Sequence, residues 1–219
     1  MSRWPRPALP VRALACALLV AGCLGGAVPS APPRPAVTPL ARPPSAPAGS
    51  GLTATIRTRL GDIVLELYDG SAPVATANFV SLARAGWYDG VAFHRLVPGF
   101  VIQGGDGVHA RAAAFDAQRA GRGGPGYTIP DEPVVGEYGR GIVAMARTPA
   151  PDSAGSQFFI VLDDAARGPL ESSRTYVIFG RVSSGMEVVD AIAAMPNSGQ
   201  PANQALDPVA MDAVTISGP

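Results

Sequence analysis

The sequence contains no lysine, and its 17 arginines are matched by 17 acidic residues, so the chain carries no formal net charge. A protein that binds nucleic acid usually shows a marked excess of positive charge, and this composition gives no sign of one. We therefore expect no nucleic-acid partner. The absence of lysine, together with much Ala, Gly, Pro and Val, indicates a GC-rich coding bias rather than a chemical function.

Cysteine and histidine are also scarce. Both cysteines lie within the first 23 residues, and the two histidines are His94 and His109. Ser/His/Asp and Cys/His sites need a histidine beside a nucleophile, and the sequence offers only poor candidates. A zinc site from these histidines and nearby Asp106 or Asp116 lacks any usual ligand spacing. We expect no metal, no cofactor and no covalent intermediate, and we expect His94 to be a structural residue.

The first 23 residues have the pattern of a secretory signal. Three arginines precede the apolar run ALACALLVAGC, which is too short to span a bilayer stably. Its last four residues, VAGC, are similar to a bacterial lipobox, in which the cysteine becomes the first mature residue and carries a diacylglycerol. Residues 1–22 are thus predicted to be a lipoprotein signal peptide and Cys23 the lipidation site. An ordinary signal peptide with a cysteine near its cleavage site is the alternative.

Residues 23–51 are predicted to form a Pro- and Ala-rich tether behind the lipidated cysteine. Prolines recur every few residues and large apolar side chains are rare, so the stretch cannot bury enough surface to offset its ordering entropy. The rest of the mature chain holds no cysteine, and its fold must rest on packing. We expect an exported protein, lipid-anchored to the bacterial cell envelope. Leu24 stands where an inner-membrane retention aspartate would, which favours the outer membrane or outer surface.

Residues 52–219 are predicted to be the folded domain, because short strand-like runs punctuated by glycine begin there. Eight runs have strand character: TATIRTRL, DIVLELY, VAFHRLV, FVIQGG, GIVAMA, SQFFIVL, TYVIFGRV and DAVTI. Gly61-Asp62 is predicted to be the two-residue turn of the first hairpin. Residues 73–83 and 185–195 have helical spacing instead. The fold class predicted is mainly β, a closed eight-stranded antiparallel barrel capped by two helices.

The stretch FHRLVPGFVIQGGD places polar side chains in what looks like a pair of core strands. Pro98-Gly99 is a turn pair, so the two strands should run antiparallel and bring Arg95 opposite Gln103, near Phe100. A guanidinium and a carboxamide both donate hydrogen bonds to carbonyl oxygens, and an aromatic ring offers a floor for an apolar ring. The stretch therefore predicts a small amphipathic site without a nucleophile.

Motifs along the whole folded domain resemble the cyclophilin-type peptidyl-prolyl cis-trans isomerases. FHRLVPGFVIQGGD is similar to their central signature, and APVATANFVSLARAGWYDGVAFHR is similar to the first helix and lead-in of bacterial members. GPGYTIPDE, GIVAMARTPAPDSAGSQFFIVL, YVIFGRV and GMEVVDAI resemble the loop, second signature, strand and helix that follow, in the family's order. The resemblance covers residues 53–217. It implies a barrel capped by two helices, with the substrate groove on the outer face of the barrel.

The chemistry that the resemblance implies is rotation about an X-Pro peptide bond, without covalent intermediate or cofactor. The implied catalytic residue is Arg95. The implied substrate-binding residues are Phe100, Val101, Gln103, Ala146, Arg147, Gln157, Phe159, Leu170 and Tyr176. The segment GPLESSRTYVIFG departs from the family pattern, because Pro169 stands near the position of a tryptophan and Tyr176 at that of a histidine. The alignment of Leu170 is open for the same reason.

Together these features predict an isomerase that assists the folding of exported or envelope proteins. Its partners would be proline-containing polypeptides and, through Cys23, a membrane, and we expect a monomer. A proline-peptide binding module or holdase with little turnover is the alternative, and a partner-binding lipoprotein that reuses the fold is a third reading. The presence of Arg95 favours the enzyme, since a pure binder has no obvious need for it.

Overall fold

The computed structural model of the protein describes residue 47 and residues 49–218. The predicted signal peptide, the lipidation site Cys23 and most of the predicted tether lie outside the described residues. Within the described part of the chain, no helix is both long and apolar enough to cross a membrane.

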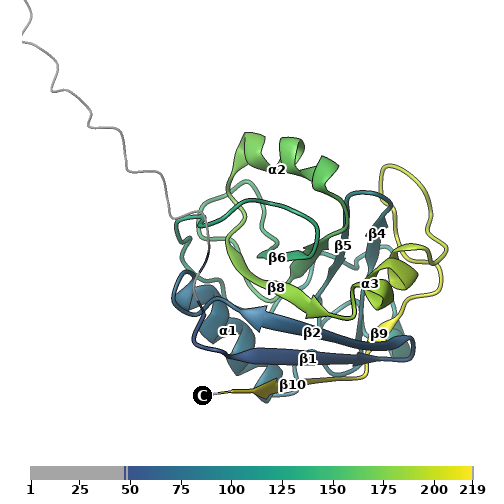
Figure 1. The fold of residues 1–219 in the computed structure, drawn as a ribbon. Coiled ribbons are helices and arrows are strands. Elements are labelled where there is room, and N and C mark those ends of the chain that lie inside the picture. Colours follow the sequence, from purple (N-terminus) through teal and green to yellow (C-terminus); the bar gives the residue numbers. More distant parts are fainter. Residues whose placement is uncertain (1–46, 48, 219) are drawn as a thin grey trace, which may run out of the picture. The chain divides into compact units, whose positions relative to one another are not determined.

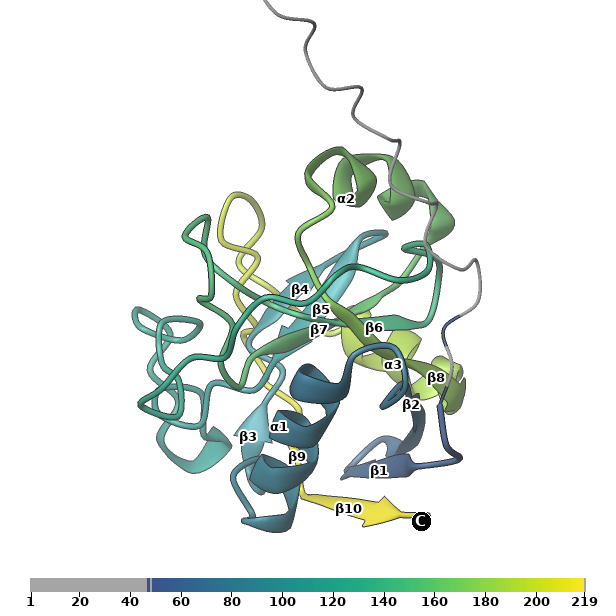
Figure 2. The same ribbon diagram turned by 90° about the vertical axis from the view of Figure 1, so that its left-hand side faces the viewer.

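Antiparallel strands make up most of the described chain. They are β1 (Thr53–Thr58), β2 (Gly61–Leu67), β3 (Val91–Ala92), β4 (Arg95–Val97), β5 (Val101–Gly104), β6 (Ile142–Met145), β7 (Phe158–Val161), β8 (Ile178–Ser184), β9 (Ala210–Met211) and β10 (Ala213–Ser217). Eight of them form one sheet in the order β10-β1-β2-β8-β6-β7-β5-β4, and β3 pairs with β9. Figures 1 and 2 show how strongly this sheet curls.

The sheet is open between β4 and β10, so the predicted closed barrel is wrong in this respect. The outer edge of β4 meets the irregular segment 196–208, which contributes only the isolated bridge between Arg95 and Gln204. That segment contains three prolines, and proline has no N–H to donate to a ladder. The mainly β, antiparallel character of the prediction is confirmed.

The predicted strand VAFHRLV is split in two. Its first part, β3, pairs with β9, while its second part, β4, pairs with β5. The first hairpin also differs: Thr58 pairs with Gly61, so the turn residues are Arg59 and Leu60. The hydroxyl of Thr58 fixes this turn, because it accepts from the N–H of Leu60 at 3.1 Å and donates to the carbonyl of Gly61 at 2.8 Å.

The two predicted helices are present as α1 (Pro73–Arg84) and α3 (Met186–Ala193), at opposite ends of the curled sheet in Figure 1. Ala72, before α1, has no side chain that could cap the helix. The carboxylate of Glu132 replaces a cap, since it accepts from the N–H groups of Val74 at 2.9 Å and Ala75 at 2.8 Å.

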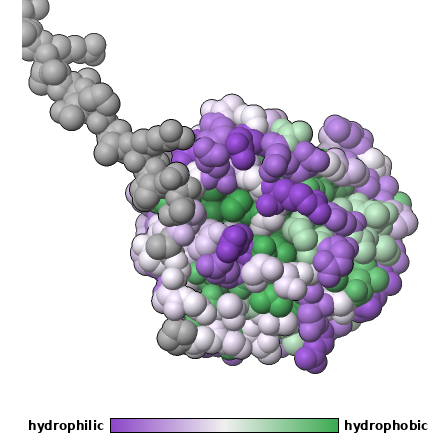
Figure 3. All heavy atoms as spheres, viewed as in Figure 1, coloured by the Kyte–Doolittle hydropathy of each residue, from purple (hydrophilic) through white to green (hydrophobic). Residues whose placement is uncertain are grey.

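A third helix, α2 (Arg167–Ser173), was not predicted. It follows a short 3-10 turn, Asp164–Ala166, whose start is capped by Asp163 through the N–H of Ala165 at 2.8 Å. The helix occupies the segment in which the sequence departs from the family pattern. In Figure 3, hydrophilic side chains gather over α2, and hydrophobic ones are visible below it, towards β8.

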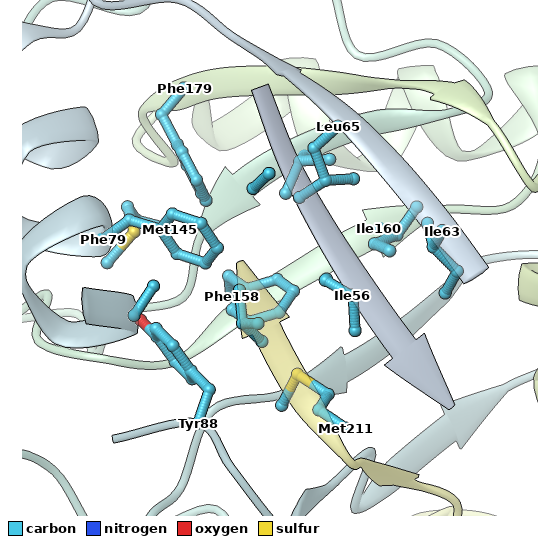
Figure 4. Packing of buried hydrophobic residues seen from close by; sticks show 14 of the residues in the cluster. Ile56, Ile63, Leu65, Phe79, Tyr88, Met145, Phe158, Ile160, Phe179 and Met211 are labelled. Atoms are coloured by element: carbon cyan, nitrogen blue, oxygen red, sulfur yellow. The ribbon is translucent and has the colours of Figure 1, made fainter. Parts of the chain in front are cut away.

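Apolar side chains cover both faces of the sheet and form two separate clusters. The main core contains the fully buried rings of Phe79, Tyr88 and Phe158, gathered together in Figure 4. A second cluster lies on the other face, and it includes Phe159, Leu170 and Tyr138. Successive residues of a strand point to opposite faces. Phe158 and Phe159 on β7 therefore serve different clusters.

Candidate active site

A pocket of about 200 Å³ opens beside the second apolar cluster. Its lining residues come from β4, the β4–β5 turn, β5, β7, α2 and the segments that follow β6 and precede β8. They are Arg95, Phe100, Val101, Gln103, Ala146, Arg147, Phe159, Leu170 and Tyr176. These are nine of the ten residues that the family resemblance implied for the site. The tenth, Gln157, lines the neighbouring pocket and contacts Gln103.

The β4–β5 hairpin brings the polar side chains together. Arg95 is paired with Gln103 in the antiparallel register, as predicted. The turn closes through the N–H of Phe100, which donates to the carbonyl of Val97 at 3.0 Å. Gly99 has a φ of 69°, a left-handed conformation that glycine adopts without steric cost. The Pro-Gly turn therefore sets the register of the two strands and with it the site.

A chain of side-chain amides fixes the orientation of Gln103. Its Nε2 donates to Oε1 of Gln157 at 2.9 Å, and Nε2 of Gln157 donates to the carbonyls of Gly121 at 2.9 Å and Gly123 at 2.8 Å. The remaining oxygen of Gln103 consequently faces Arg95, whose Nη1 lies 3.5 Å away. This long contact leaves the guanidinium available to other acceptors.

Asp106 holds the loop that anchors these amides. Its fully buried carboxylate accepts from the N–H groups of Val108, His109, Gly121 and Gly123 at 2.8 to 3.0 Å. Burial alone would raise the pKa of Asp106, but these four hydrogen bonds together hold it below its ordinary value. In the sequence Asp106 was a candidate only as a metal ligand, and this role in the loop was not predicted.

Arg95 brings a partly desolvated positive charge to the pocket. Burial lowers the pKa of its guanidinium, while the nearby phenol of Tyr176 acts in the opposite direction. Arginine nevertheless remains protonated in proteins. Among the described residues Arg95 forms no ion pair. A charge in this setting interacts more strongly with a carbonyl than a solvated one does.

The rest of the pocket is apolar. Val101, Phe159 and Leu170 are each at most 4% exposed, and the Tyr176 ring meets the Phe159 ring edge-on, with centroids 5.4 Å apart. Leu170 comes from the unpredicted helix α2. Its alignment with the family was open in the sequence, and in the structure it lies in the wall of the pocket. The hollow offers van der Waals contact to a small apolar ring.

Arg147 lines the pocket, but its side chain has a structural role. It is only 9% exposed, forms an ion pair with Asp131 at 3.1 Å and donates to the carbonyl of Ala150 at 2.6 Å. The family resemblance implies that Ala146 and Arg147 bind a peptide through their backbone. Because the N–H of Ala146 already donates to Gln157, a peptide could use only the other backbone groups of these two residues.

A second pocket of about 460 Å³ adjoins the first and shares Gln103, Ala146 and Arg147 with it. One of its walls is formed by residues 121–125 and 127–128, a glycine-rich stretch for which no role at the site was predicted. Because the pockets share a wall, an extended peptide could lie across both. The signal in the sequence was the segment GPGYTIPDE, residues 124–132, which resembles a loop of the family and overlaps this wall.

His94 lies behind the site, 2% exposed, and not in the pocket. Burial lowers its pKa to about 4, against a smaller opposing effect of Asp106. In the unfolded chain His94 has the ordinary histidine pKa of about 6.5 and binds a proton there. Lowering the pH from 7 to 5 should therefore reduce the free energy of unfolding by about 2 kcal/mol. We expect urea unfolding to show this decrease in the wild-type protein. In His94→Leu the free energy of unfolding should differ much less between pH 7 and pH 5. An equal pH dependence in both proteins would contradict the assignment.

The geometry defines a class of protein. A partly desolvated cation and an oriented amide flank an apolar hollow, and none of the ten residues is a serine, threonine, cysteine, histidine or acid, as expected of a site that changes the conformation of a bound peptide. The family model described as cyclophilin type peptidyl-prolyl cis-trans isomerase/CLD matches residues 53–216. The chain belongs to this family of enzymes, the cyclophilins.

Curated relatives and solved structures agree with this assignment. A probable peptidyl-prolyl cis-trans isomerase of Brucella suis is 44% identical over 142 residues, which are 64% of this chain and 70% of the relative. A peptidyl-prolyl cis-trans isomerase of Acinetobacter baylyi is 39% identical over 180 residues, 78% of this chain and 89% of the relative. A cyclophilin type isomerase of Cryptosporidium parvum, crystallised in the presence of the dipeptide Ala-Pro, has a TM-score of 0.63 and 29% identity, covering 76% of this chain and 99% of that one.

Proposed function

We propose that this cyclophilin is exported, anchored to the bacterial cell envelope by a lipid on Cys23, and assists folding by accelerating rotation about X-Pro bonds in envelope or secreted proteins. The isomerase chemistry follows from the family and from the opposed Arg95 and Gln103 beside the apolar pocket. Export and anchoring are supported by the sequence pattern of residues 1–23. We expect the protein to act as a monomer.

Arg95 is the proposed catalytic residue. An X-Pro bond is held planar by resonance between its nitrogen and its carbonyl, and exchange without a catalyst takes tens to hundreds of seconds. In the twisted state the nitrogen lone pair is localised and can accept a hydrogen bond. Donors of the guanidinium that reach the carbonyl of the substrate proline and its ring nitrogen would stabilise this state more than either planar state. No covalent bond is made or broken.

The other pocket residues hold the substrate while the bond rotates. The proline ring would fill the hollow between Phe100, Phe159 and Leu170, and Gln103 would bind the peptide backbone. Part of the chain on one side of proline would extend into the neighbouring pocket. Fixing the ring while the rest of the peptide turns confines the rotation to one bond.

The lipid anchor can be tested with the two cysteines of the full-length chain. We expect Cys23→Ser to abolish incorporation of a radiolabelled fatty acid and to release the protein from the membrane fraction. Cys16→Ser is the matched control, because Cys16 lies in the predicted signal peptide, and it should leave labelling intact. Labelling that persists in Cys23→Ser, or a wild-type protein found unlabelled in the soluble fraction, would contradict the lipobox assignment.

A further inference from the structure

Tyr138 makes two hydrogen bonds to the backbone of one residue of the pocket wall. Its side chain is fully buried, in the irregular segment before β6. Its hydroxyl donates to the carbonyl of Tyr176 at 2.7 Å and accepts from the N–H of Tyr176 at 3.1 Å. A single hydroxyl thus meets both backbone polar groups of Tyr176.

Tyr176 needs such support because it lies outside the sheet. It follows α2 and precedes β8, which begins at Ile178. The ring of Tyr176 lines the pocket and packs edge-on against Phe159 at an interplanar angle of 86°. In a strand, ladder hydrogen bonds would fix the backbone and hence the ring. Here the Tyr138 hydroxyl takes the place of a neighbouring strand.

Further contacts tie the same two segments together. Arg174 donates to the carbonyls of Val134 at 3.1 Å and Gly136 at 3.0 Å and forms an ion pair with Glu171. Glu171 accepts from the N–H of Tyr138 at 3.4 Å. The segment that carries α2 and Tyr176 is therefore held against residues 134–138, and among these contacts it is that of Tyr138 which reaches a residue lining the pocket.

We propose that Tyr138 is a positioning residue of the isomerase site, which holds Tyr176 against Phe159 and so fixes one wall of the proline pocket. Tyr138 does not itself line the pocket. This inference rests on the proposed use of the pocket for the proline ring. Without the clamp, the Tyr176 backbone would move and the hollow would fit the ring less closely, both in the planar and in the twisted state.

The Tyr138 hydroxyl keeps its proton at any pH used for such an assay. Burial raises the pKa of Tyr138 to about 12, and its hydrogen bond to the Tyr176 backbone opposes a further rise. The hydroxyl therefore remains both a donor and an acceptor. Its effect on the reaction should be independent of pH, as expected of a positioning group.

The substitution Tyr138→Phe keeps the ring and removes both hydrogen bonds. In the full-length protein, with a short peptide that contains one Ala-Pro bond, we expect KM to rise about threefold or more and kcat to change less than about twofold, because ground and twisted states lose the same contact. Tyr88→Phe is the matched control. Tyr88 is also fully buried, and its hydroxyl donates to the carbonyl of Ser156 at 3.0 Å. Removal of this hydroxyl should lower the melting temperature and leave KM unchanged.

A double-mutant cycle tests whether Tyr138 acts through Tyr176. In a Tyr176→Ala background, Tyr138→Phe should change KM by less than about 1.5-fold, since the ring that it positions is gone. An equal rise of KM in both backgrounds, or an unchanged KM in Tyr138→Phe alone, would overturn the proposal.

Hydrogen exchange separates a failure of this inference from a failure of the proposed function. The amide of Tyr176 should exchange about tenfold faster or more in Tyr138→Phe, whether or not the protein turns over the peptide. A wild-type protein without isomerase activity would sink the proposed function alone. Unchanged exchange at Tyr176 would show that Tyr138 does not hold this residue.

Discussion

Arg95→Ala is expected to lower kcat/KM for isomerisation of an Ala-Pro peptide at least about tenfold, which corresponds to a loss of about 1.4 kcal/mol of transition-state stabilisation. The loss should fall mainly on kcat, because the guanidinium interacts more strongly with the twisted amide than with the planar one. Arg95→Lys should also be impaired. Lysine keeps the charge but lacks the planar fork that can reach a carbonyl and a ring nitrogen together.

The matched control for Arg95→Ala is Arg57→Ala. Arg57 is an exposed arginine whose contact with Asp62 is 4.0 Å long, and such surface pairs contribute little to stability. Turnover should be unchanged in this variant, and circular dichroism should show an intact fold in both. If Arg95→Ala is folded and isomerises at the wild-type rate, the catalytic role assigned to Arg95 is wrong.

Phe158→Ala and Phe159→Ala should separate stability from substrate binding within one strand. Phe158 is fully buried and packs against the rings of Phe79, Tyr88, Phe93 and Phe179. Its truncation is expected to lower the free energy of unfolding by about 3–5 kcal/mol. Phe159→Ala, which empties one wall of the pocket, should instead raise KM about tenfold at a smaller cost in stability.

Urea unfolding and steady-state kinetics measured on both variants check this pair of expectations. KM of Phe158→Ala should stay near the wild-type value at a temperature where the protein is folded. The assignment of the two faces would be refuted by the reverse pattern, in which Phe158→Ala impairs binding and Phe159→Ala mainly lowers stability.

The polar centre of the site could be predicted because its geometry is local. Pro98-Gly99 lies between two short apolar runs, and strand pairing across that turn places Arg95 opposite Gln103 without further information. The residues from more distant segments, such as Leu170 and Tyr176, came from the family resemblance. The structure brings them to the same pocket.

The features that escaped prediction depend on contacts between distant segments. Nothing in the sequence around Tyr138 shows that its hydroxyl meets Tyr176. Helix α2 is short, and helices of this length are marginal in isolation. It is stabilised by the packing of Leu170 and by the contacts of Arg174 with distant residues, which the local sequence does not show. The sheet ends at β4 because the segment that lies along the free edge of β4 forms no strand there, and the sequence does not show which segment reaches this edge.

Exchange spectroscopy on a peptide with one Ala-Pro bond tests the central claim most directly. With catalytic amounts of the full-length protein, the rate of cis-trans interconversion should rise in proportion to protein concentration and far exceed the uncatalysed rate, which is of the order of one event in tens to hundreds of seconds. The claim would be contradicted if the peptide's resonances shift on binding while its interconversion rate stays at the uncatalysed value.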